Sequence, residues 1–120
     1  MPRLIPFNSN FPIDRQLGID AGPIVLVNVF TLDKLDEPSF LRIWREDASL
    51  IKQQPGFISS QLHRAIGENP MYLNYAVWES TAHYRAVLDL FRSQFATYPS
   101  STVASPHLFQ KIAVAGICVA

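Results

Sequence analysis

The feature that most restricts the fold of this chain is an alternation of strand and helix patterns from residue 23 onward. An apolar, β-branched run at 23–31, interrupted only by Asn28, is typical of a strand covered on both faces. Asp36 can cap a helix, and apolar residues then recur at helical spacing until Pro55 interrupts the pattern. The first part of this region therefore predicts a strand followed by a helix.

The following region repeats this pattern with one additional strand. Segments 57–66 and 71–79 have strand character on either side of a Gly-Glu-Asn-Pro turn, which predicts a hairpin. Ser80 can cap a second helix, whose strongly aromatic stripe continues until Pro99 breaks it. After a polar segment, residues 110–119 are predicted to form the last strand.

The predicted order of elements is strand, helix, strand, strand, helix, strand. Two such units joined by right-handed crossovers make a four-stranded antiparallel sheet with both helices on one face, which is the ferredoxin-like α+β arrangement. Residues 1–22, rich in Pro, Asn and Asp, are predicted to be an extended arm, and residues 23–120 the domain. The apolar side chains of the arm can pack on the domain itself or on a neighbouring subunit.

Length, charge and cysteine content exclude several classes of function. A chain of 120 residues suits one domain. Ten basic and ten acidic residues cancel, so neither nucleic acid nor an anionic membrane surface is an expected partner. The single Cys118 excludes a disulfide framework or a multi-cysteine metal site, and the sequence has neither a signal peptide nor a membrane span. We therefore expect a cytoplasmic protein without a metal centre.

One face of the predicted sheet has no helix to cover it. Alternate residues of the first and third strands would expose a large apolar surface there in a monomer. We therefore expect a homodimer closed through the sheet faces as a barrel, with the helices outside. The residues on this face are Val25, Val27, Val29, Leu73, Tyr75 and Val77.

The opposite parity of the same strands carries the candidate site, because Tyr84 lies on the stripe of the second helix that faces it. Amide, indole and phenol groups in an apolar pocket can bind and polarise a phenol or a quinone without a metal. Each residue also has a purely structural interpretation, but their convergence on one pocket favours a binding site. The candidates are Leu26, Asn28, Phe30, Asn74, Trp78, Tyr84 and Leu88.

Few acids or bases are expected in this pocket. His63 lies on the second strand, where it is either a pocket base and substrate-binding residue or a solvated residue at the dimer interface. Glu46 and Asp47 are adjacent in the first helix and point in different directions, so they do not form a carboxylate dyad. Apart from His63, no strong acid or base is expected on the inward face.

The segments QPGFISSQLHRA (54–65) and NYAVWES (74–80) resemble the antibiotic biosynthesis monooxygenase family, and the likeness extends over about 23–119. The resemblance implies a dimeric α+β barrel that uses molecular oxygen, without a prosthetic group, to oxidise a polycyclic phenol to a quinone. It also implies catalytic roles for Asn74, Trp78 and Tyr84. The Asn and the Trp recur widely in the family, so the match at Tyr84 is the discriminating one.

Two alternative functions stay open. The family also contains haem-degrading members, which use an Asn of the first strand, a Trp in the second helix and an axial His near the end of that helix. Asn28 fits the first role, but the helical Trp position falls near Val87, residues 95–98 contain no His, and His107 lies further on. Haem is therefore disfavoured. The second alternative is a dimeric protein that binds a small molecule without turnover.

Overall fold

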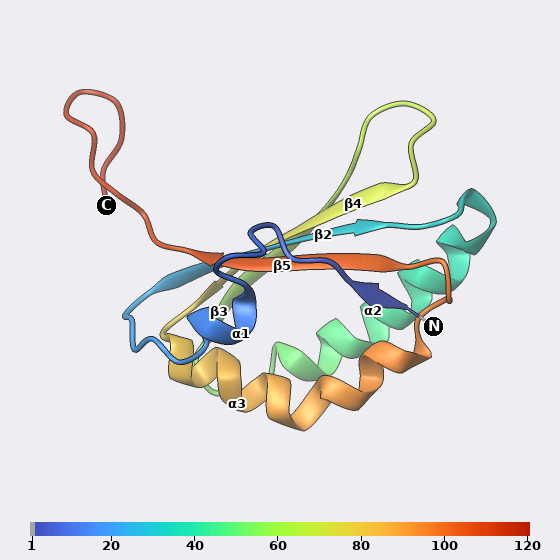
Figure 1. Ribbon diagram of the computed structural model, residues 1–120, viewed down its shortest axis with the longest axis horizontal. Helices are drawn as coiled ribbons and strands as arrows, with labels where there is room; N and C mark the ends of the chain where they lie inside the picture. The colour runs from blue at the N-terminus through green and yellow to red at the C-terminus, as the bar shows by residue number, and fades with distance from the viewer. Residues whose placement is uncertain (1) are drawn as a thin grey trace.

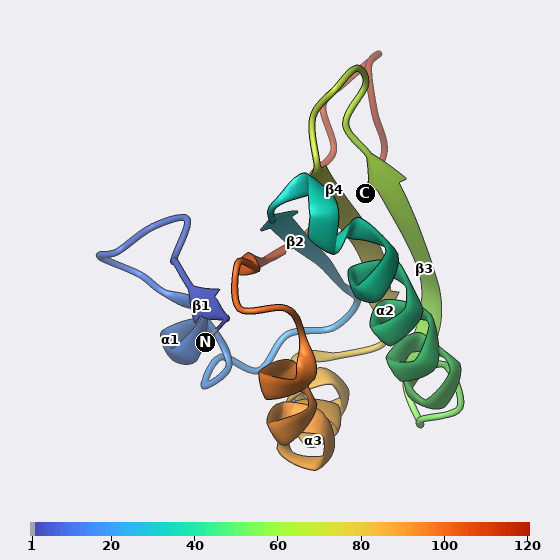
Figure 2. The same ribbon diagram turned by 90° about the vertical axis from the view of Figure 1, so that its right-hand side faces the viewer.

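The computed structural model, which describes residues 2–120, is a twisted sheet with both long helices on one face (Figures 1 and 2). Neighbouring strands run antiparallel in the order β5-β2-β4-β3, which confirms the predicted ferredoxin-like fold. No helix in the described part of the chain is long and apolar enough to cross a membrane. The elements are β1 (Arg3–Leu4), α1 (Ile13–Gln16), β2 (Ile24–Thr31), η1 (Lys34–Asp36), α2 (Glu37–Ile51), β3 (Phe57–Arg64), β4 (Met71–Trp78), α3 (Thr81–Phe91), η2 (Arg92–Thr97) and β5 (Val103–Phe109).

The two helix starts predicted from capping residues differ in detail. Ser80 caps α3 as predicted, since its hydroxyl accepts a hydrogen bond from the backbone N–H of His83 at 3.1 Å. Asp36 occupies the predicted position before α2, but its side chain makes no capping hydrogen bond. Its backbone already has helical angles as the last residue of η1, and its carboxylate accepts instead from the hydroxyl of Ser101 at 2.7 Å.

The prediction of the last strand was wrong. β5 is Val103–Phe109, in the segment expected to be a loop, whereas residues 110–120 project beyond the sheet and contain an isolated bridge between Val114 and Cys118 (Figure 1). Pro106 is tolerated in β5 because β1 pairs only with the first two residues of that strand, which leaves the rest at the sheet edge. A segment with Ser, Pro and His at its centre therefore forms the strand, and the more apolar tail does not.

The N-terminal segment is more ordered than the predicted extended arm. β1 pairs in parallel with β5 and makes the sheet five-stranded, and α1 follows it. The side-chain amide of Gln16 replaces a missing strand at the edge of β5: it donates to the carbonyl of Leu108 and accepts from the N–H of Leu108, both at 2.9 Å. Leu17 is buried in the core. The arm therefore packs on its own domain.

Two hydrophobic clusters fill the two ends of the space between sheet and helices. One is built around Trp78 and Tyr84, and the other around Phe30, Phe40 and Tyr72. Between them, the helix-facing positions of β2, β4 and β3 carry short side chains, which leaves the middle of the interface unfilled. These short residues are Asn28, Asn74, Ala76 and Ser60.

Candidate functional site

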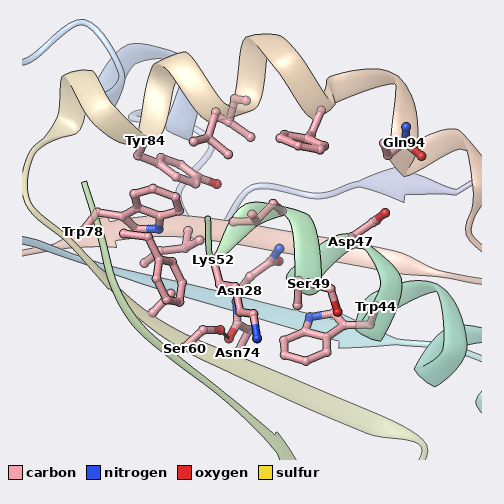
Figure 3. A pocket seen from close by; sticks show the side chains of 18 of the residues that line it. Asn28, Trp44, Asp47, Ser49, Lys52, Ser60, Asn74, Trp78, Tyr84 and Gln94 are labelled. Atoms are coloured by element: carbon pink, nitrogen blue, oxygen red, sulfur yellow. Dashed lines mark hydrogen bonds between the residues drawn. The ribbon is translucent and has the colours of Figure 1, made fainter. Parts of the chain in front are cut away.

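A cavity of about 630 Å³ occupies the unfilled middle of the interface between sheet and helices (Figure 3). This volume lies within the range of sites for small organic ligands. Strands β2, β3 and β4 form its floor, and α2, α3 and η2 form its walls. Of the residues predicted to form a pocket, it brings together Leu26, Asn28, Phe30, Asn74, Trp78, Tyr84 and Leu88.

Two amides lie side by side on the floor of the cavity. Asn28 and Asn74 are directly opposite each other in the register of β2 and β4. The hydroxyl of Ser60 on β3 donates to Oδ1 of Asn74 at 2.7 Å (Figure 3). Because that bond occupies the oxygen, the NH₂ group of Asn74 is the part left to donate to a ligand. Oδ1 of Asn28 is buried without a hydrogen-bond partner among the described residues.

An indole and a phenol form the end wall of the cavity. Trp78 is only 1% exposed, and its ring lies 5.4 Å from that of Phe57 and 5.8 Å from that of Tyr84. Figure 3 shows the hydroxyl of Tyr84 directed into the cavity. Burial raises the pKa of this phenol well above its usual range, so it stays protonated and can donate a hydrogen bond at neutral pH.

These polar groups share an unusual property. Neither the indole N–H of Trp78 nor the hydroxyl of Tyr84 has a hydrogen-bond partner in the described part of the chain, and the NH₂ of Asn74 donates to none of the described residues. Buried polar groups in folded proteins are nearly always paired with protein or water. Among the cavity-lining groups of the described residues, Oδ1 of Asn28 is the atom that is fully buried without a partner, and a ligand in the cavity can supply that partner.

His63 has to be corrected as a pocket residue. It does not line the cavity but pairs with Leu73 on the other face of the sheet, where its Nδ1 lies 3.3 Å from the carbonyl of Leu73. A bulge between Phe57 and Ser59 lets both Ser59 and Ser60 reach the cavity. Because strand side chains alternate after that bulge, His63 shares the exposed face with Gln61.

Asp47 is the functional candidate that the sequence reasoning missed. It comes from α2, is half-buried and lines the cavity. Burial raises the pKa of its carboxyl, and a hydrogen bond from the hydroxyl of Tyr98 opposes that rise. Glu46 and Asp47 indeed do not form a dyad, but Asp47 follows Trp44 by three residues on the inward stripe. The helical spacing of Trp44, Asp47, Ala48 and Ile51 was the signal that would have found it.

The cavity does not fit haem with an axial histidine. None of the described residues that line it is a histidine. His107, the remaining candidate, lies on β5 opposite Val27, on the sheet face away from the cavity, where its ring contacts Phe7 and Phe109. Val87, near which the resemblance placed the helical Trp of haem-degrading members, lines the cavity wall on α3. In residues 2–120, no three His, Cys, Asp or Glu side chains cluster as a metal site.

The fold and the cavity define a class: a ferredoxin-like α+β domain that holds an apolar chamber, with polar groups unpaired, between its sheet and its helices. Within that class, the chain belongs to the antibiotic biosynthesis monooxygenase family, whose family model matches residues 23–101. The resemblance inferred from the segments 54–65 and 74–80 is thereby confirmed. No curated protein matches the sequence.

Solved structures support the same assignment of fold. SnoaB, a cofactor-independent oxygenase from Streptomyces nogalater, superposes with a TM-score of 0.70 at 23% identity, over 80% of this chain and 99% of SnoaB. A candidate monooxygenase from Shewanella loihica PV-4 superposes with a TM-score of 0.67 at 26% identity, over 81% of this chain and 100% of that protein.

Proposed function

We propose that this protein is a monooxygenase that oxidises a phenolic, polycyclic aromatic compound with molecular oxygen and without a prosthetic group. The observation that carries the proposal is one apolar cavity of about 630 Å³ lined by Asn74, Trp78 and Tyr84, with the unpartnered buried oxygen of Asn28 on its floor. Family membership and the likeness to a cofactor-independent oxygenase support it. Asn74, Trp78 and Tyr84 are the proposed catalytic residues.

The proposed reaction relies on the substrate to activate oxygen. The substrate lies against the end wall that Trp78 and Tyr84 form and loses a phenolic proton, and the resulting anion transfers one electron to oxygen. The substrate radical and superoxide then combine and take up a proton to give a hydroperoxide. Its O–O bond breaks as the same carbon loses its hydrogen as a proton, which leaves a quinone carbonyl and water. In this scheme the protein supplies positioning and charge stabilisation rather than redox chemistry of its own.

Each proposed role follows from the hydrogen-bonding capacity of the group. The NH₂ of Asn74 donates to the developing enolate oxygen, and Asn28 assists from the adjacent strand. The protonated hydroxyl of Tyr84 orients the peroxide and can give it a proton. The apolar walls, which include Leu26, Phe30 and Leu88, exclude water from the radical pair.

Oxygen consumption tests the proposal. With an anthrone or a dihydroxynaphthalene as model substrate, the purified protein is expected to consume oxygen and form the quinone. Asn74→Ala, Trp78→Phe and Tyr84→Phe should each lower kcat, by about 10- to 1000-fold for the loss of a donor to the anion. If Asn74→Ala and Trp78→Phe both leave the rate unchanged, the mechanism is wrong. Quinone binding without any oxygen uptake would favour the non-catalytic binding protein instead.

We also propose that the protein works as a homodimer joined through the sheet faces. The face away from the helices carries Val27, Val29 and Leu73 at half-buried positions and Tyr75 at 39% exposure. Apolar surfaces of this extent normally mark an interface. A second copy placed on this face would close the two sheets into a barrel and leave both cavities under their helices.

A further inference from the structure

The cavity has two chemically different ends. The sheet end presents one donor, the NH₂ of Asn74, whose oxygen is bonded to Ser60, beside the unpartnered oxygen of Asn28. The helix end presents an acceptor, the carboxylate of Asp47, which Figure 3 shows extending from α2 toward the segment that carries Gln94. A ligand that satisfies both ends therefore needs an acceptor oxygen at one end and a hydroxyl donor at the other.

The charges around Asp47 leave its carboxylate without an ionic partner. None of the ion pairs between described residues includes it. On its own helix, Glu46 lies beside it and raises its pKa, while Arg45 and Lys52 are exposed residues of the cavity rim. From the other elements, the phenols of Tyr98 and Tyr84 are the titratable groups that line the same cavity.

Tyr98, in the segment after η2, lines the same cavity as Asp47. It is buried, and both burial and the neighbouring Asp47 carboxylate raise the pKa of its phenol far above the usual range. The phenol therefore stays protonated at physiological pH and can donate a hydrogen bond to Asp47. A carboxylate has about four lone-pair sites, so one hydrogen bond from Tyr98 leaves others open toward the cavity.

Building on the proposed function, we propose that Asp47 is a further catalytic residue, the acceptor of the substrate's hydroxyl proton, and that the pocket selects aromatics with oxygen substituents at both ends. In the step, the substrate O–H bond breaks, the proton moves to an oxygen of Asp47, and the electron pair stays on the substrate oxygen. The negative charge spreads through the rings to the oxygen that Asn74 holds. The raised pKa of Asp47 suits this role, since it brings the carboxylate closer to the pKa of a phenol.

Ligand binding tests the inference independently of turnover. The probes are 2,6-dihydroxyanthraquinone and 2,6-dimethoxyanthraquinone at pH 6, with quenching of protein fluorescence as the signal, because both tryptophans of the chain, Trp44 and Trp78, line the cavity. Asp47→Asn is expected to weaken the dihydroxy probe by about 10-fold or more, as for loss of a hydrogen bond to a charged group. The dimethoxy probe should change by less than about 2-fold. Glu46→Gln removes the same charge from the exposed side of α2 and leaves the carboxylate of Asp47 in place with a lower pKa, so neither probe should bind more weakly.

The rate of oxygen consumption as a function of pH provides the second readout. The wild-type rate should fall as the pH drops through the raised pKa of Asp47, and Asp47→Asn should abolish this acid limb together with most of the rate. Tyr98→Phe removes the hydrogen bond that lowers the pKa of Asp47, so the acid limb should move to higher pH. If the contact between Asp47 and Tyr98 were purely structural, Tyr98→Phe would lower the stability of the protein without moving the acid limb of the rate profile.

The outcomes separate this inference from the proposed function. If Asp47→Asn binds both probes like the wild type and keeps the acid limb while Asn74→Ala is impaired, Asp47 is not the proton acceptor and the proposed function stands. If the wild type binds neither probe and consumes no oxygen, the proposed function fails and the inference falls with it. If the variants other than Asp47→Asn respond differently to the dihydroxy and dimethoxy probes as the wild type does, and only Asp47→Asn loses this difference in affinity, the inference is supported.

Discussion

A single hydroxyl fixes the orientation of the amide at the centre of the site. Without the hydrogen bond from Ser60, the side chain of Asn74 could rotate by 180° and present its oxygen to the substrate instead of its NH₂. An oxygen there would repel the developing anion that the NH₂ group is proposed to stabilise. Ser60 is thus a positioning residue. It acts through Asn74, because its hydrogen bond to the amide oxygen sets which end of that amide faces the substrate.

Removal of this hydroxyl should therefore reduce catalysis more than stability. Ser60→Ala is expected to lower kcat with an anthrone substrate by about 3- to 30-fold, with a smaller change in KM, because the amide is no longer held. Steady-state oxygen consumption measures both constants. Ser60→Thr keeps the hydroxyl and should retain most of the rate. Equal rates for Ser60→Ala and the wild type would show that Asn74 needs no orientation by Ser60.

At the scale of elements, α2 is tied to the sheet at its first residue. Glu37 accepts a hydrogen bond from the hydroxyl of Tyr72 on β4 at 2.7 Å and pairs with Arg64 of β3 through both carboxylate oxygens, at 2.9 and 3.1 Å. Arg64 also donates to the carbonyls of Ala65 and Gly67 in the hairpin turn. One carboxylate therefore joins the helix that carries Asp47 to the strands that carry Ser60 and Asn74.

The ionisation of Glu37 predicts a pH dependence of stability. Its hydrogen bonds to Arg64 and Tyr72 lower its pKa in the folded protein below the ordinary glutamate value. A group whose pKa is lower when folded stabilises the protein above its unfolded pKa of about 4.3, and this stabilisation is lost as the pH falls through the folded pKa. Thermal unfolding should therefore show a lower Tm at pH 7 for Glu37→Gln than for the wild type. Between pH 7 and pH 3, the Tm of Glu37→Gln should fall by less than the Tm of the wild type.

Glu46→Gln is the matched control for this measurement. Its carboxylate pairs only with Arg42, four residues away on the exposed side of α2, at 3.5 Å. Exposed pairs of this kind contribute little to stability. Its pH profile should follow the wild type, and a Glu37→Gln profile parallel to the wild type would contradict the assignment to Glu37.

At the scale of the whole molecule, the open sheet face is the feature that a monomer leaves unexplained. The N-terminal segment covers only the β5 side, where Phe7 contacts His107, and Tyr75 remains exposed near the centre of the face. We predict a dimer of twice 13.5 kDa by multi-angle light scattering at micromolar concentration. Tyr75→Arg should shift the mass toward the monomer, because it buries a charge in the proposed interface. Leu35→Arg, at a position 94% exposed just before α2, is the control and should leave the mass unchanged. A wild-type protein that is monomeric in this measurement would rule out the dimer.

Much of the fold follows from the sequence itself, because helical periodicity, strand alternation, turns and helix caps all involve residues that are close together in the chain. Periodicity and turn residues located β2, β3, β4, α2 and the start of α3 to within a few residues, whereas α3 ends at Phe91 and η2 continues toward Pro99. Strand parity placed Asn28, Asn74 and Trp78 on one face. The cap at Ser80 was also local, since donor and acceptor lie three residues apart. These features depend on neighbours in the chain, which the sequence displays directly.

Only the tertiary structure decided which segment forms the last strand, what the N-terminal arm does and which acid enters the pocket. β5 is a strand because β2 offers it partners from more than 70 residues away, despite its proline, and Gln16 completes its edge across 92 residues. The bulge in β3 determined which serines face the cavity, and the approach of Tyr98 to α2 made Asp47 more than a surface carboxylate. Each of these outcomes rests on contacts between distant parts of the chain, whose energies no local pattern encodes.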